Sequence, residues 1–387
     1  MKLLRSARFP AVVLLIAAAL GLALSNAPSG AALAGFLDTH LGPRGTAFDL
    51  SIRHWISDGL LAVFFLTAAI ELRHELTVGR LTRPREALVP AIAAVGGVLV
   101  PIALYLLVAG GTEYARGWPI PTATDIAFAL GVVAVFGRGL PGSVRVFLLA
   151  LAILDDIVGI VFIAVLFTTD VNVVALIVAV VLVVGFGVLS RLRPSSAMRV
   201  PWGLALAAIG LATWAAVLQS GVHATIAGVA LGLTMGPRAG DRLAHALEPA
   251  VNAVVLPLFA FAAAAVVIPQ VAADELTPAF WGVLLALPVG KLLGIVAAGW
   301  LAQRLLGTTA NARLALPDLI AAALLGGIGF TVSLLLGELA FGADHEAGAE
   351  VTIAVLLAST IAMLLGSTAV AVRARHWRRA EAGSVET

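Results

Sequence analysis

The sequence predicts an all-α polytopic membrane protein with about twelve transmembrane helices. Of the 387 residues, 61% are hydrophobic and only 12% are charged, which is more apolar surface than a soluble chain of this length can bury. The apolar residues form long runs joined by short connections, as membrane-spanning helices require. We therefore expect one transmembrane transporter domain over residues 1–387, with a cytoplasmic tail at 374–387.

The predicted helices follow from the apolar runs, in order along the chain. The first run comes after Lys2, Arg5 and Arg8 and could pass for a signal peptide, but we expect it to be retained because the later helices then alternate correctly across the membrane. The runs lie at about 9–26, 58–78, 87–110, 119–137, 144–169, 172–191, 201–218, 222–236, 246–269, 279–304, 315–341 and 349–373.

Positive charges fix the expected orientation. With the N-terminus inside, nearly all arginines fall in inside segments, and the outside segments hold only Arg44, Arg53 and Arg116. This bias satisfies the positive-inside rule and predicts that both termini are cytoplasmic. The net charge of +2 is too small to indicate a nucleic-acid partner, and the absence of cysteine excludes disulfides and thiolate chemistry.

The longest connection, at about 27–57, is expected to lie outside the bilayer. Its alternating stretch Asp49–Arg53 predicts a small hairpin. The helix that follows ends with Glu71, His74 and Glu75 at the cytoplasmic side. Two interpretations remain open for these residues, a solvated helix end or a cluster that senses internal pH.

The fourth and eleventh segments are expected to be interrupted helices. Pro119 and Pro121 break the fourth segment just before Thr124 and Asp125, and glycines break the eleventh between 326 and 329. Each interrupted segment is the middle one of a triplet, and the two triplets run in opposite directions. Paired interruptions of this kind are typical of a transporter site within an inverted-topology repeat.

The fifth segment carries Asp155 and Asp156 between the apolar runs Val146–Leu154 and Ile157–Phe167. An ionised carboxylate at bilayer depth costs at least about 2.5–3.5 kcal/mol, so the pair is expected to bind a cation, carry protons, or both. Neighbouring helical residues point about 100° apart. One aspartate should therefore line a cavity, and the other should lean toward a helix that offers Lys291.

Lys291 lies near the middle of the tenth segment, and the only other lysine is Lys2. A buried lysine can lose its proton, so Lys291 is either a structural counter-ion or a proton carrier, and the two roles are compatible. We expect Asp125 to balance the N-terminal ends of the broken helices and Lys291 their C-terminal ends. His223, at the start of the eighth segment, is either a satisfied helix-end histidine or a ligand.

These residues predict ion exchange. Sodium, like other hard cations, prefers oxygen ligands, and two carboxylates with threonine hydroxyls and freed carbonyls supply them. The same carboxylates bind protons, so the two ions would compete at one site with alternating access. The alternatives are a sodium-coupled solute symporter, a passive channel and, in a different class, an intramembrane aspartyl protease. The protease needs aspartates from separate helices, as Asp125 with Asp156 would provide.

From about Phe9 to Trp377 the chain resembles the bacterial NhaA sodium/proton antiporter family, whose inverted repeat is an established property of that fold. The segments that carry the resemblance are Asp58–Phe65, Thr124–Ala129, Leu154–Asp156, Ser220–Thr225, Leu256–Ala262, Gly290–Lys291 and Gly327–Thr331.

The resemblance implies a secondary transporter without a cofactor. Asp155 and Asp156 would bind sodium or lithium and exchange it for protons, while Thr124 and Asp125 form the crossing-helix site with Lys291 as partner. Family members export one sodium for more than one proton, switch on at alkaline internal pH, and form dimers through the external hairpin, here about 45–57.

The pH-sensing candidates are Glu71, His74, Glu75, His223, His245 and Glu248. The chain departs from the family pattern here. Ala244 replaces a common glutamate, Glu248 a histidine, His74 an arginine and Ala263 an asparagine. These changes put the pH set-point in doubt and leave the transport chemistry unaffected.

Overall fold

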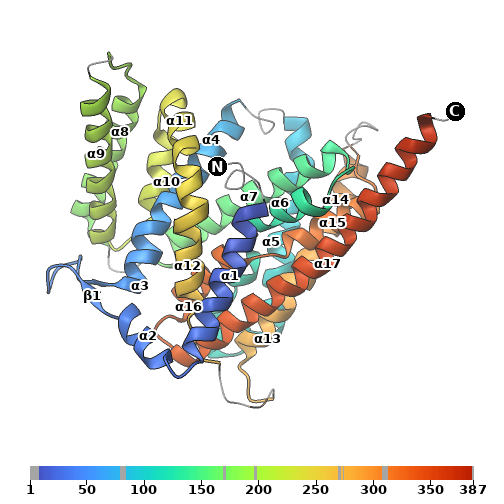
Figure 1. Ribbon diagram of the computed structural model, residues 1–387, viewed down its shortest axis with the longest axis horizontal. Coiled ribbons are helices and arrows are strands. Elements are labelled where there is room, and N and C mark those ends of the chain that lie inside the picture. The colour runs from blue at the N-terminus through green and yellow to red at the C-terminus, as the bar shows by residue number, and fades with distance from the viewer. Residues whose placement is uncertain are drawn as a thin grey trace. The chain divides into compact units, whose positions relative to one another are not determined.

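The computed structural model in Figure 1 is built almost entirely of helices, which confirms the predicted all-α class. The structure describes residues 8–78, 84–168, 171–195, 198–268, 272, 274–306 and 313–385. Regular β structure in these residues is limited to one short antiparallel pair.

Eight described helices are long and apolar enough to cross a membrane, or up to ten if each of two bent helix pairs counts as one span. The predicted count of twelve is therefore not confirmed. Within the predicted runs 119–137 and 222–236 the helices are α6 (Ile126–Phe136) and α10 (Thr225–Thr234). Both are much shorter than the roughly 20 residues that a spanning helix needs.

The chain forms two compact units whose segments alternate along the sequence. Unit 1 comprises Met1–Ile16, Arg80–Gly159 and Val266–Thr387, and unit 2 comprises Ala17–Gly79 and Ile160–Ala265. Neither unit is a continuous stretch of chain, so the units are not successive domains. The single domain expected over residues 1–387 stays a prediction.

Unit 1 is organised around the close contact between α5, which carries Gly96, and α14, which carries Gly294. Gly96 and Gly294 face each other, and a Cβ added at either one would lie under 3 Å from the carbonyl oxygen of the other. Because α14 starts at Lys291, this contact fixes the position of the lysine relative to α5. The elements of unit 1 are α5 (Pro84–Ala109), η3 (Glu113–Gly117), η4 (Ile120–Thr122), α6, most of α7 (Gly142–Leu166), α13 (Pro278–Leu285), η6 (Ala286–Gly290), α14 (Lys291–Leu305), α15 (Leu316–Gly326), α16 (Phe330–Phe341) and α17 (His345–Val385).

Unit 2 uses glycines in the same way. Gly228 and Gly232 of α10 lie against the backbone oxygens of Ala62 and Leu66 in α4 (Leu61–Thr77). Its other elements are α2 (Gly30–Leu37), β1 (His40–Leu41), β2 (Leu50–Ser51), α3 (Ile52–His54), η1 (Trp55–Leu60), α8 (Val173–Arg191), α9 (Arg199–Gln219), α11 (Pro237–Ala250), η5 (Val251–Val255) and α12 (Leu256–Ala263). The first helix, α1 (Arg8–Ser25), begins in unit 1 and ends in unit 2.

The predicted hairpin is present but shorter than its sequence pattern suggests. Strand β1 pairs antiparallel with β2, with His40 opposite Ser51. Of the alternating stretch Asp49–Arg53, only Leu50 and Ser51 are in a strand, because the Ser51 hydroxyl accepts a hydrogen bond from the His54 N–H and starts α3. Trp55 then donates from Nε1 to the Leu41 oxygen at 3.0 Å and closes the hairpin.

The last helix is longer than predicted. We expected a span at 349–373 followed by a tail at 374–387, whereas α17 runs from His345 to Val385 and reaches the C-terminal end in Figure 1. Its charged end is held to α15, since Arg373 and Trp377 both donate hydrogen bonds to Asp318. Residues 386–387 lie outside the described part of the chain.

Candidate functional site

Two interrupted helices meet at their breaks in unit 1, as the sequence predicted. In one, η4 ends at Thr122, the chain is extended at Ala123, and α6 starts at Ile126. In the other, α15 and α16 are bent by 44° across Gly327–Gly329. The Asp125 N–H donates to the Ile328 oxygen at 2.5 Å, which joins the two breaks directly.

Asp125 binds the N-terminal ends of both half-helices. Its Oδ1 accepts from the Phe128 N–H at 3.2 Å, in the first turn of α6. Its Oδ2 accepts from the Thr331 N–H at 3.2 Å and from the Thr331 hydroxyl at 2.6 Å, in the first turn of α16. A carboxylate is favoured there because helix N-termini carry partial positive charge. Asp125 therefore lies at the helix N-termini where the sequence placed it, and its part in ion transport stays a prediction.

Lys291, Asp155 and Thr124 form a second cluster beside this crossing. The Lys291 ammonium forms an ion pair with Asp155 Oδ2 and donates to the Thr124 hydroxyl oxygen at 3.1 Å. The exposed fractions of Lys291, Asp155 and Thr124 are 0%, 1% and 0%. The expected pairing of Lys291 with one member of the aspartate doublet is thus present, and the member is Asp155.

Thr124 connects this ion pair to the broken helix. Its hydroxyl oxygen lies 2.7 Å from Asp155 Oδ2 and 2.7 Å from the carbonyl oxygen of Gly326, the last residue of α15. A hydroxyl has a single proton, so it donates to one of these oxygens at a time. Through Thr124 the Lys291 charge faces a helix C-terminus, where a cation is favoured.

The second carboxylate oxygen of Asp155, Oδ1, differs from Oδ2 in its surroundings. Among the residues that the structure describes, the buried Asp155 Oδ1 has no hydrogen-bond partner. Buried polar atoms are rarely unpaired, because leaving one unpaired costs about 1–3 kcal/mol. With the Thr124 hydroxyl and the Gly326 carbonyl beside this carboxylate, the described residues offer several oxygen ligands next to the Lys291 ammonium, which suits a hard cation or a proton.

Asp156 lies within α7, one residue after Asp155. Its side chain is outside the part of the chain that the structure describes. The expectation that it lines a cavity therefore stays a prediction.

The pH-sensing candidates lie in unit 2. Glu71, His74 and Glu75 are on α4, and His245 and Glu248 are on α11, which packs against α4. Glu71 is close enough to Glu75 and Glu248 to interact with their charges. His74 Nδ1 lies 3.6 Å from Asp241 Oδ1, a partner that sequence reasoning missed.

His223 does not join that group. Its Nε2 lies 3.3 Å from Asp58 Oδ1, and its Nδ1 lies 2.8 Å from the Thr225 hydroxyl. Asp58 precedes Glu71 by thirteen residues in one helical stretch, which is about 20 Å. The contacts of His223 match the interpretation of a satisfied helix-end histidine.

Sequence reasoning also missed side chains that complete the crossing. The Ser359 hydroxyl accepts from the Phe330 N–H at 3.1 Å, and the Ser333 hydroxyl donates to the Ile120 oxygen at 2.8 Å. Ser333 lies in the glycine-rich break, which was a usable signal. Ser359 is one of several hydroxyls on an apolar helix, and no local pattern distinguishes it.

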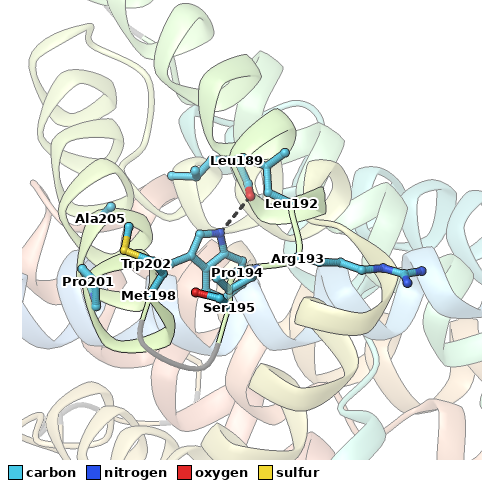
Figure 2. A pocket seen from close by; sticks show the side chains of 9 residues that line it. All are labelled: Leu189, Leu192, Arg193, Pro194, Ser195, Met198, Pro201, Trp202 and Ala205. Atoms are coloured by element: carbon cyan, nitrogen blue, oxygen red, sulfur yellow. Dashed lines mark hydrogen bonds between the residues drawn. The ribbon is translucent and has the colours of Figure 1, made fainter.

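A pocket of about 500 Å³ lies elsewhere, in unit 2, and Figure 2 shows it closely. Trp202 lies in its middle and donates from Nε1 to the Leu189 oxygen at 3.0 Å, while the Arg193 side chain points away. A solute site needs several polar groups that converge, and the lining here is mostly apolar. The lining residues are Leu189, Leu192, Arg193, Pro194, Ser195, Met198, Pro201, Trp202 and Ala205.

Comparison with known proteins places this geometry in context. The sequence model of the family described as Na+/H+ antiporter 1 matches residues 1–370. The chain is 54% identical to the Na(+)/H(+) antiporter NhaA 2 of Clavibacter michiganensis over 99% of this chain and 94% of the relative. It is 44% identical to the Na(+)/H(+) antiporter NhaA of Tropheryma whipplei over 94% of each chain. It is 41% identical to the Na(+)/H(+) antiporter NhaA of Mycolicibacterium smegmatis, over 98% of this chain and 89% of the relative.

Proposed function

The chain belongs to the Na+/H+ antiporter 1 family, the NhaA antiporters, and we propose that it exports cytoplasmic sodium or lithium electrogenically in exchange for external protons. Membership makes it a sodium/proton antiporter and a secondary transporter, and not an enzyme. The aspartyl-protease alternative is therefore wrong. The proposal concerns the ions besides sodium, the charge moved per cycle, and the residues that bind the ions.

The observation that carries the proposal is the buried ion pair of Lys291 and Asp155 beside Asp155 Oδ1, for which the described residues provide no hydrogen-bond partner. The pair as it stands is neutral, and a sodium ion that enters adds a positive charge to a site without solvent. An uncompensated charge there is costly, so sodium binding requires the release of at least one proton. Metal ion and proton thereby exclude each other, which is the competition that antiport needs.

The oxygen ligands in this proposal come from Asp155, Asp156, Thr124 and the carbonyl of Gly326. Lys291 is the counter-ion when sodium is absent, and Asp125 holds the two helix breaks together. One sodium replaces two protons, one held in the Asp155–Lys291 pair and one on Asp156. Each cycle then moves one net charge, so the membrane potential contributes to the driving force.

The wider setting is also part of the proposal. Both termini face the cytoplasm, as the arginine distribution predicts, and the membrane is the bacterial inner membrane, as the family of the chain implies. The external hairpin region at about 45–57 joins two copies into a homodimer. The charges on α4 and α11, Glu71, His74, Glu75, His245 and Glu248, tune the activity to internal pH for sodium and pH homeostasis, with His223 as an outlying sixth candidate.

Everted membrane vesicles test the proposal directly. An internal pH dye should report proton efflux when sodium or lithium is added, and no efflux when potassium is added. Vesicles that carry the Asp155→Asn variant at equal abundance are the matched control and should show no efflux. Equal responses to sodium and potassium, or efflux through the variant, would contradict the proposed site.

A further inference from the structure

Asp318 is a buried carboxylate outside the candidate ion site. It lies in the first turn of α15 and is 2% exposed. Its Oδ1 accepts from Arg373 Nε at 2.7 Å and from Trp377 Nε1 at 3.2 Å, both on the charged end of α17. We call these three side chains the α15 clamp.

The clamp and the ion site lie at opposite ends of one short helix. Asp318 is in the first turn of α15, and Gly326, whose carbonyl oxygen faces the Thr124 hydroxyl, is its last residue. Eight residues separate them, which is about 12 Å along the helix axis. Any tilt or shift of α15 at the clamp is therefore passed to the Gly326 oxygen.

Packing makes α15 stiff enough to pass such a shift on. Leu319 of α15 lies against Gly299 of α14, and Leu325 lies against Gly366 of α17. A Cβ at Gly366 would lie 2.6 Å from a methyl carbon of Leu325, so the two helices already touch closely. The side chains of α15 have little room to absorb a displacement locally.

The backbone at either end of α15 does not fix the helix by itself. Toward the ion site it ends in the glycine break, where the chain bends by 44°. At its start, the N-cap residue Ala315 has no side chain that could cap the helix. The charged hydrogen bonds of the clamp are what hold this end against α17.

We propose that Asp318, held by Arg373 and Trp377, is a positioning residue for the ion site, acting through α15 to keep the Gly326 oxygen and the Thr124 hydroxyl where a cation can use both. This inference rests on the proposed function of that site. Cation ligands tolerate little displacement, and loss of groups that support them typically costs about 10–100-fold in metal affinity.

Sodium-dependent exchange by the full chain in vesicles tests the inference. Asp318→Asn should raise the KM for sodium about tenfold while the maximal rate changes by less than about twofold. The matched control is Asp344→Asn, which removes a half-exposed ion pair with Arg116 (3.7 Å) in the same unit. That variant should keep the wild-type KM.

Two further variants keep the test decisive if Asp318→Asn fails to fold. Trp377→Phe removes the indole donor and keeps an aromatic ring, and should raise the KM about two- to threefold. In the charge-reversed double variant Asp318→Arg with Arg373→Asp, the restored pair should recover most of the wild-type KM. An unchanged KM in Trp377→Phe, together with unrestored exchange in the double variant, overturns the inference.

The readouts separate this inference from the proposed function. If wild-type vesicles show no sodium-dependent proton efflux, the proposed function fails, whatever the clamp does. If wild type exchanges normally and Asp318→Asn lowers thermal stability with an unchanged KM, the clamp is only structural and the positioning role is wrong. A raised KM for sodium in Asp318→Asn, with the wild-type KM in Asp344→Asn, supports both the proposed function and the positioning role of Asp318.

Discussion

Lys291 and Asp155 form an ion pair where neither side chain reaches solvent, although 136 residues separate them in the chain. Each charge is tolerated there because the other is present. The pair lies beside the crossing of two broken helices, and Thr124 connects it to the end of one of them. Stability and ion binding are therefore linked at this point.

Removing the lysine should destabilise the protein. Lys291→Ala leaves the Asp155 carboxylate buried without its cation, which typically costs about 3–5 kcal/mol when a buried pair is broken. The thermal midpoint of the purified variant in detergent should fall, and sodium should raise it by more than it raises that of wild type, because the metal ion replaces the missing charge. A variant with the wild-type midpoint would show that the pair does not stabilise the fold.

Removing Asp125 should affect stability and exchange together. Asp125→Ala takes away acceptors for the first turns of both α6 and α16, for which we expect a loss of about 2–3 kcal/mol in unfolding free energy. Ser333→Ala, which loses one hydrogen bond to the Ile120 oxygen, is the matched control and should cost about 1 kcal/mol. Thermal denaturation and vesicle exchange measure both effects. Unchanged stability in Asp125→Ala would show that its carboxylate does not stabilise the first turns of α6 and α16.

Asp156→Asn should abolish exchange without loss of folded protein. The substitution keeps the size of the side chain and removes a carboxylate that, in our proposal, carries one of the two protons. Proton efflux from everted vesicles is the measurement, and gel-filtration behaviour of the purified variant is the control. Retained sodium-dependent efflux would remove Asp156 from the site.

Acidity on the side from which sodium binds should inhibit sodium binding competitively. Lower pH favours the protonated site, so the KM for sodium should rise as pH falls, by up to about tenfold per pH unit for each competing proton. The maximal rate should stay the same, because saturating sodium displaces the protons. A fall in maximal rate at constant KM would instead indicate separate proton and sodium sites.

Several features of the site could be predicted because burial of charge in an apolar segment is so costly. Lys291, Asp125 and Asp155 each stand out from their segments, and each was expected to need a partner. The sequence could not tell which aspartate faces Lys291, because that depends on the rotation of α7 by a fraction of a turn. It also could not show that Asp125 accepts hydrogen bonds from Thr331. That contact forms only when the two interrupted helices cross at their breaks.

The clamp shows why other features were missed. Asp318 and Arg373 lie at the ends of predicted helices, where a charged residue normally reaches water and needs no partner. The residues after Arg373 are strongly charged, as in a cytoplasmic tail, whereas α17 runs through them to Val385 with Arg373 and Trp377 both bonded to Asp318. The predicted count of twelve spans stays unconfirmed, since apolar composition does not reveal how short the described helices α6 and α10 are.

The central claim is that one buried acidic site holds either an alkali metal ion or protons. Isothermal titration of the purified protein with sodium, repeated in buffers of different ionisation enthalpy, measures the protons released for each ion bound. We expect a measured heat that depends on the buffer and corresponds to proton release, and no binding heat in Asp155→Asn. Sodium binding with the same heat in every buffer would contradict it.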